Sequence, residues 1–172
     1  MDMPLDTKTC WNCPIKHQAV CSRCEPDELT QLEDIKYYRS YEAGQPVIWA
    51  GDHMEFVASV VTGIASLSQT MEDGRTQMVG LLLPADFIGR PGRDSAPFDV
   101  VAVSDLTICC FRKRPFEPLT STTPRIPPPL LALTLDELHS DRQCPPVLRR
   151  HTSLATVATV PAITCCVATR LA

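Results

Sequence analysis

Apolar positions along the chain follow two different spacings, which change near residue 38. In the stretch EPDELTQLEDIKYY, Leu29, Leu32 and Ile35 recur at helical spacing. They follow Pro26 and Asp27, residue types that are typical of a helix start. We therefore predict a short amphipathic helix in this stretch.

From Tyr38 onwards the chain has short runs rich in valine, isoleucine, threonine and aromatic residues, separated by glycine turns. Such runs predict an antiparallel sandwich or barrel. The dipeptide Asp73-Gly74, between SLSQTME and RTQMVGL, predicts a hairpin. The later run LTICCFRK also has the composition of a strand.

The last third of the chain changes character again. Pro127 to Pro129 cannot lie inside a helix, so a helix can begin only near them. In LLALTLDELHSDR, Leu131, Leu135 and Leu138 form a seam that could meet a partner or pack on the sandwich. Residues 143–172 contain no acidic residue, no glycine and no lasting apolar period. We interpret them as an irregular, out-of-frame tail; a natural disordered tail is the alternative.

Length and charge narrow the classes of function. The 172 residues suffice for one main domain with a short appendage. A net charge of -4 argues against a basic nucleic-acid surface spread over the whole molecule. There is no apolar run of about 18 residues, as a membrane helix needs, and no secretory signal at the start. We expect a cytoplasmic protein without membrane contact.

Four of the nine cysteines stand close together as C-x2-C-x7-C-x2-C, a pattern that indicates a metal. They are Cys10, Cys13, Cys21 and Cys24. In each C-x2-C pair the turn brings both sulfurs to one side. A structural zinc would use all four, although the middle gap is shorter than in most zinc modules. An iron-sulfur cluster could instead use three of them and a distant fourth.

The strand-like run LTICCFRK offers this distant ligand as Cys109 or Cys110. Neighbouring side chains of a strand point to opposite faces, so only one of the two can face a given cluster. Positive groups near the arm thiols would stabilise an anionic thiolate centre and favour deprotonated ligands. The candidates are Lys16, His17 and Arg23.

Several segments together resemble the FNR branch of the CRP/FNR family of transcription regulators, and most of all its FnrL type. They are the cysteine arm, IKYYRSYEAGQPVIWAGD, VASVVTGIASLSQTMEDGRTQMVGLLLPADFIGRPGR and LTICCFRKRPFE. The resemblance covers residues 10 to 142. It implies a mainly β fold with flanking helices: a double-stranded β-helix (jelly-roll) sandwich of the cyclic-nucleotide-binding type, followed by a truncated dimerisation helix. The implied parts are a cluster-binding arm (1–24), a sensor sandwich (25–118), the start of the dimerisation helix (119–142) and the tail (143–172).

The resemblance also implies an oxygen sensor. In this family three N-terminal cysteines and one sandwich cysteine hold a 4Fe-4S cluster. Its conversion by oxygen weakens dimerisation through a long helix that leads to a DNA-binding helix-turn-helix. The positions that match the family ligands are Cys10, Cys13, Cys21 and Cys109, with Cys24 and Cys110 as alternates. Cys109, on the sheet, would transmit the state of a flexible leader to the body of the domain.

Family members act as homodimers on promoter DNA together with RNA polymerase, but this chain departs from them at its end. The resemblance stops at Gln143, and Pro145 and Pro146 would end any helix there. No later segment offers a recognition helix suited to a major groove. We therefore expect a monomer or a weak dimer that does not bind DNA by itself.

Two other classes of ligand or activity are not expected. Cyclic-nucleotide binders of this fold place a glutamate after the FIG-like turn, whereas here Arg90 stands there and Pro91 follows, so we expect no cyclic nucleotide. No Ser/His/Asp constellation, phosphate loop or carboxylate pair stands out, so we do not expect an enzyme. Two hypotheses remain: an oxygen-responsive iron-sulfur transcription regulator, or a zinc-stabilised interaction domain without redox activity.

Overall fold

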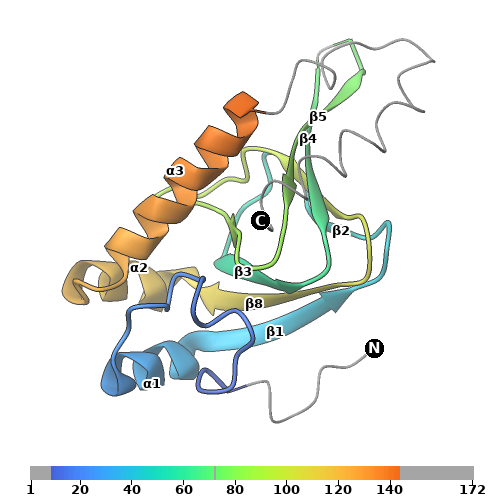
Figure 1. Ribbon diagram of the computed structural model, residues 1–172. Helices are drawn as coiled ribbons and strands as arrows, with labels where there is room; N and C mark the ends of the chain where they lie inside the picture. Colours follow the sequence, from blue (N-terminus) through green and yellow to red (C-terminus); the bar gives the residue numbers. More distant parts are fainter. Residues whose placement is uncertain (1–8, 72, 144–172) are drawn as a thin grey trace.

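The computed structural model describes residues 9–71 and 73–143, whose strands form two four-stranded antiparallel sheets packed as a sandwich (Figure 1). The first sheet has the order β1-β8-β3-β6 and the second the order β2-β7-β4-β5. The strands are β1 (Lys36–Tyr41), β2 (Pro46–Ile48), β3 (Phe56–Thr62), β4 (Ala65–Thr70), β5 (Thr76–Leu82), β6 (Phe87–Ile88), β7 (Asp99–Ala102) and β8 (Leu106–Arg112). The predicted fold class, mainly β with flanking helices, is confirmed.

The predicted first helix is α1 (Pro26–Ile35). Pro26 takes the first helical position, where its missing N–H has no partner to lose. The Glu25 backbone N–H donates to the Glu28 carboxylate over 2.7 Å as part of a capping box. Leu29 and Leu32 are buried, so the apolar stripe read from the sequence is the packed face.

The predicted hairpin and the predicted start of the last helix are also confirmed. β4 and β5 pair around the turn that contains Asp73 and Gly74, with Thr70 opposite Thr76. α3 (Pro127–Gln143) begins at the first of the three consecutive prolines. A further helix, α2 (Lys113–Thr122), was not predicted.

The seam of α3 does not pack on the sandwich. Leu131 is 60% exposed and Leu135 is 54% exposed. The interpretation in which the seam packs on the sandwich is therefore wrong for these two leucines, and a partner contact stays a prediction. The Leu138 side chain and the tail from residue 144 lie outside what the structure describes. The structure therefore does not test whether the tail is an out-of-frame reading. No helix among the described residues is long and apolar enough to cross a membrane.

Buried side chains form two clusters, one on each face of the first sheet. The inner cluster fills the space between the sheets and contains Phe56, Ala58, Val60, Leu82, Val100, Ile108 and Cys110, among others. The outer cluster lies between the first sheet and the elements that cover it, which are the arm, α1, α2 and the start of α3 (Figure 1). It contains Cys10, Ile15, Val20, Cys21, Leu29, Leu32, Val57, Cys109, Phe111, Phe116 and Ile126, among others.

Candidate cysteine site on the outer face of the first sheet

The cysteine arm is folded against the sheet. Short backbone hydrogen bonds close successive turns along it, including Ala19 N–H to the Ile15 carbonyl at 2.9 Å and Cys24 N–H to the Cys21 carbonyl at 3.1 Å. Ile15, Ala19 and Val20 are at most 5% exposed and join the outer cluster. Residues 9–24 therefore form a packed cover over the first sheet, instead of the flexible leader expected from the sequence.

The thiols predicted as ligands meet in this cover. Cys10 is 5% exposed, while Cys21 and Cys109 are each 7% exposed. All three belong to the outer cluster, and the partly buried Cys13 and Cys24 pack against it. The fold thus brings the arm cysteines, from the start of the chain, to a strand cysteine almost a hundred residues later.

The two strand cysteines lie on opposite faces, as the alternation predicts. Cys109 is opposite Tyr38 of β1 and Ser59 of β3, so these three residues form one row across the sheet. This row faces the arm, because Cys109 and Tyr38 both pack in the outer cluster. Cys110 is opposite Tyr37 and lies in the inner cluster between the sheets. The geometry supports Cys109 over Cys110 as the thiol that can face a centre under the arm.

Burial raises the pKa of Cys10, Cys21 and Cys109, so these three thiols are protonated at neutral pH while no metal is bound. Burial, together with the charges of Cys10, Cys13 and Cys24, raises the pKa of Cys21 to about 12. Burial raises the pKa of Cys109 well above its usual value, and repulsion from the same arm thiols adds to this. Ionising several of these thiols together therefore requires a compensating positive charge, such as a metal supplies.

One lysine already supplies positive charge inside the site. Lys36 Nζ donates a hydrogen bond to Cys10 Sγ at 3.3 Å, and the Lys36 side chain is only 7% exposed. Burial alone would lower the pKa of Lys36, but its charge interaction and hydrogen bond with Cys10 raise that pKa above its usual value. Of the cations suggested from the sequence, His17 and Arg23 are exposed, and Lys16 lies over the Trp11 ring at 5.0 Å.

Lys36 was missed because it lies outside the arm. It is the first residue of β1, and only the pairing of β1 with β8 brings it over the cysteines. No spacing rule within the arm could have indicated it. The sequence shows only a lysine directly before an aromatic strand, and this does not by itself indicate a ligand site.

Two buried hydroxyl groups beside Cys109 have no hydrogen-bond partner among the described residues. They are Tyr38 Oη and Ser59 Oγ. Leaving a buried hydroxyl unpaired costs about 1–3 kcal/mol, so such groups call for an explanation. Both can donate a proton to an acceptor on the arm side of the sheet. Four thiols, one buried cation and two unpaired donors fit an anionic, sulfur-rich group better than an apolar filling.

Cys24 lies at the edge of this arrangement. Burial raises its pKa to about 11, and the next influences are the charges of Glu28 and Cys10, opposed by Arg125. Arg125 comes from the loop between α2 and α3 and bonds Glu28 at 3.2 Å. Cys24 therefore sits beside an ion pair near the start of α1, whereas Cys21 is buried within the cluster. Among the described residues, no three His, Cys, Asp or Glu side chains stand close enough to hold a single metal ion.

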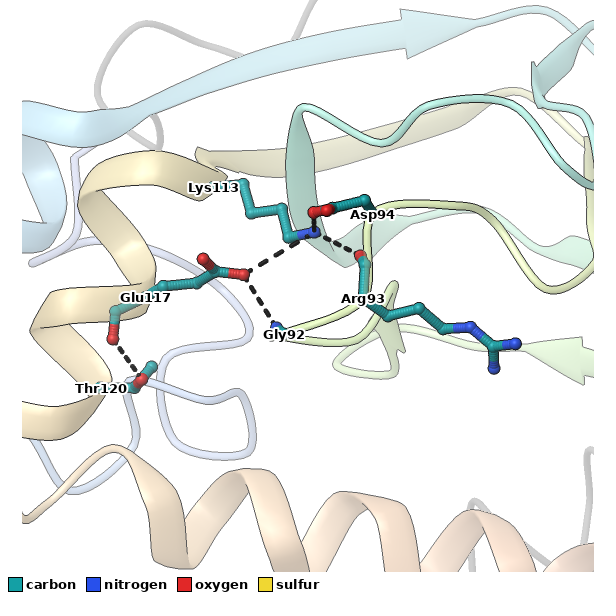
Figure 2. A network of polar contacts seen from close by, with 6 residues as sticks. All are labelled: Gly92, Arg93, Asp94, Lys113, Glu117 and Thr120. Carbon is teal, nitrogen blue, oxygen red and sulfur yellow. Dashed lines mark hydrogen bonds and ion pairs between the residues drawn. The ribbon is translucent and has the colours of Figure 1, made fainter.

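A second polar network holds the loop in which cyclic-nucleotide binders of this fold place a glutamate. Lys113, the first residue of α2, is 5% exposed and bonds the Arg93 carbonyl and the Asp94 carboxylate (Figure 2). Glu117 accepts a hydrogen bond from the Gly92 N–H at 2.8 Å. The Glu117 carboxylate therefore already pairs with the Gly92 N–H of this loop. Arg90 stands where the cyclic-nucleotide binders have this glutamate, and its side chain is exposed.

Comparison with known proteins agrees with this architecture. A model of the cyclic nucleotide-binding domain family matches residues 38–123. The chain is 57% identical to the transcriptional activator protein FnrL of Cereibacter sphaeroides, over 94% of this chain and 65% of that protein. It is 30% identical to the nitrogen fixation regulation protein FixK of Bradyrhizobium diazoefficiens, over 87% of this chain and 63% of that protein.

The solved structure of FixK2 from Bradyrhizobium japonicum is also similar, with a TM-score of 0.59 and 25% identity. The similarity covers 73% of this chain and 64% of that chain. The chain therefore spans slightly less than two thirds of the length of these relatives.

Proposed function

Because the chain belongs to the cyclic nucleotide-binding domain family and, through its relatives, to the CRP/FNR regulators, we propose that it is the sensor part of an oxygen-responsive iron-sulfur transcription regulator. The observation that carries the proposal is the meeting of Cys109 with the arm thiols in one buried cluster. The relatives named here are a transcriptional activator and a regulation protein, so a regulatory role is favoured over an enzymatic one.

In this proposal Cys10, Cys13, Cys21 and Cys109 hold a 4Fe-4S cluster, which, when bound, supplies a centre that oxygen converts. Cys21 is more deeply buried than Cys24, so we propose Cys21 as the third arm ligand. Cys109 faces the arm and Cys110 faces the space between the sheets, so we propose Cys109 as the strand ligand. Lys36 offsets part of the negative charge of the thiolates.

A packed route leads from Cys109 to the helix that the family uses for dimerisation. Phe111 lies two residues beyond Cys109 on the same face and stacks on Phe116 of α2, with ring centroids 5.2 Å apart. Ile126 directly precedes α3, is fully buried and belongs to the same cluster. A change in how the arm is held is therefore felt at the base of α3, because packed interiors transmit displacement.

We infer that α3 provides whatever contact this chain makes with a second copy. Leu131 and Leu135 expose apolar surface on a helix that runs along one side of the sandwich (Figure 1). Two leucines would bury little surface area in a contact between two copies of the chain, so we expect a weak dimer at most. We propose promoter DNA and RNA polymerase as partners of the whole regulator, and the chain spans 65% of the length of FnrL.

The test compares two serine variants under anaerobic conditions. We expect the unmodified chain to be brown, to bind about four irons per chain and to bleach in air. Cys109→Ser should lose the colour, whereas Cys110→Ser should keep it, because Cys110 faces the space between the sheets. A colourless chain with one zinc would favour the zinc-stabilised interaction domain. A Cys109→Ser variant that assembles an unchanged four-iron centre would refute the ligand set.

A further inference from the structure

The hydroxyls of Tyr38 and Ser59 flank Cys109 from the two neighbouring strands. Tyr38 is opposite Cys109 on β1, and Ser59 is opposite it on β3. Residues directly opposite in an antiparallel pair hold their side chains on the same face about 5 Å apart. The two hydroxyls therefore lie on either side of the one strand thiol that faces the arm.

Neither group makes a hydrogen bond of normal geometry with the described residues, although Tyr38 lies close to the Cys109 thiol. Ser59 is 1% exposed, and both Ser59 Oγ and Tyr38 Oη are buried without a hydrogen-bond partner. Two such atoms in one row of one sheet are unusual, because almost all buried polar groups in folded proteins are paired. Packing does not account for them, since alanine or valine at position 59 and phenylalanine at position 38 would fill the same places without an unpaired hydroxyl.

The inner face gives a comparison. Tyr37, the neighbour of Tyr38, is opposite Cys110 and packs against the inner cluster. Its hydroxyl is not among the buried side-chain atoms that lack a hydrogen-bond partner. On the outer face, burial and the charge of Cys109 both raise the pKa of Tyr38, so its hydroxyl lies close to this thiol and to the side where the arm thiols gather. An anionic group held by these thiols would offer acceptors on that side.

We propose that Tyr38 and Ser59 donate hydrogen bonds to sulfur atoms of the group held by Cys109 and the arm cysteines, and so set its stability and reduction potential. This inference rests on the proposed function. Each hydroxyl would donate one O–H to a sulfur that carries negative charge, the stronger kind of hydrogen bond. Hydrogen bonds to sulfur favour the reduced, more negative state and are a main way in which proteins tune such centres. Tyr38 and Ser59 are thus positioning residues, while the cysteines remain the ligands.

The experiment uses the anaerobically loaded chain and four variants: Tyr38→Phe, Ser59→Ala, the two combined, and Tyr37→Phe as the matched control. Resonance Raman spectra in H2O and D2O report hydrogen bonds to sulfur, because the Fe–S stretching bands shift on deuteration. We expect the shift in the unmodified chain and in Tyr37→Phe, a smaller shift in each single variant, and the smallest in the double variant. The reduction potential should become more negative in the same order.

Two further readouts separate this role from a merely structural one. Loss of outer-shell partners typically weakens metal binding by about tenfold or more, so iron should pass to a chelator about tenfold faster from the double variant. The metal-free double variant should unfold at the same or a higher urea concentration than the metal-free unmodified chain, because it lacks two unpaired buried hydroxyls.

The outcomes distinguish the two proposals. An unmodified chain that binds no iron-sulfur group would overturn the proposed function, and this inference with it. A loaded unmodified chain whose deuterium shift and potential are matched by the double variant would overturn only the role of the hydroxyls. A double variant whose metal-free form is markedly less stable than the unmodified chain would also contradict the inference, because the hydroxyls would then have a structural partner.

Discussion

Replacement of Gly63 by alanine tests whether the turn between β3 and β4 fixes the start of β8, the strand that carries Cys109. Gly63 has a φ of +88°, in the left-handed region that disfavours other residues. A Cβ at this position would lie 2.2 Å from the Asp105 carbonyl oxygen and 2.9 Å from Leu106 Cα. Both are backbone atoms, so no side-chain rotation relieves the overlap. The start of β8 must shift instead.

Gly44 is the matched control, because it shares the strain but not the overlap. Its φ is +87°, and a Cβ there would meet nothing within 4 Å. Gly44→Ala should therefore cost only the left-handed strain, about 1–2 kcal/mol of unfolding free energy. Gly63→Ala adds overpacking of about 1–3 kcal/mol, so its total cost is about 2–5 kcal/mol.

Urea unfolding of the metal-free, reduced chain, followed by circular dichroism, measures both costs. The second readout is the amount of iron bound after anaerobic loading. Gly63→Ala should bind less iron than Gly44→Ala, because a shift of β8 moves Cys109 away from the arm thiols. Equal unfolding free energies and equal iron contents for the two variants would refute the claim that this turn positions the strand.

Three further predictions concern single side chains of the outer cluster. Lys36→Met should make anaerobic iron release to a chelator about tenfold faster or more, through loss of a charge-assisted bond of about 1.5–3 kcal/mol, whereas Lys16→Met should not. Ile126→Ala should lower the free energy of urea unfolding by about 2–5 kcal/mol, because the side chain is fully buried. The raised pKa of Cys21 stabilises the metal-free fold below about pH 9, and this contribution is lost as pH rises toward 12. Urea midpoints should therefore fall above pH 9, and less steeply in Cys21→Ala.

The features predicted correctly from the sequence were those that local chemistry decides. Pro26 marks a helix start because the ring fixes φ and lacks a donor, and Asp73-Gly74 marks a hairpin because glycine accepts a positive φ. The opposite orientations of Cys109 and Cys110 follow from the two-residue period of any strand. None of these depends on which strands are neighbours.

Helix α2 was missed because local chemistry pointed the other way. Pro118 lies inside it, and a proline in a helix interior removes one hydrogen bond and crowds the preceding turn. Burial offsets this penalty: Phe116 is fully buried and lies against both Phe111 and Phe87. Tertiary packing therefore decided the conformation of a segment whose intrinsic preference is poor.

The surroundings of the thiols depend on strand order, which the sequence does not display. Tyr38 and Ser59 are 21 positions apart, yet both flank Cys109 because β8 lies between β1 and β3. The same order places Lys36 beside Phe111 and over Cys10. A cysteine spacing predicts that a metal is held, but the groups that we propose to tune it come from elements paired at long range.

If the chain has the proposed sensor function, this arrangement explains why it would need a sandwich and not only a cysteine arm. The arm buries Ile15 and Val20 on a sheet face that also supports Phe116 and Ile126, so one apolar cluster is shared between the thiols and the base of α3. Burial raises the pKa values of Cys21 and Cys109, and the thiols repel one another when ionised. The stability of this cover should therefore depend on whether a positively charged metal centre is bound to the thiols. In the proposed function, loss of the held group would also remove the acceptors of the Tyr38 and Ser59 hydroxyls. A coupling between chemistry at the arm and the position of α3 would then follow from shared packing, without a separate relay.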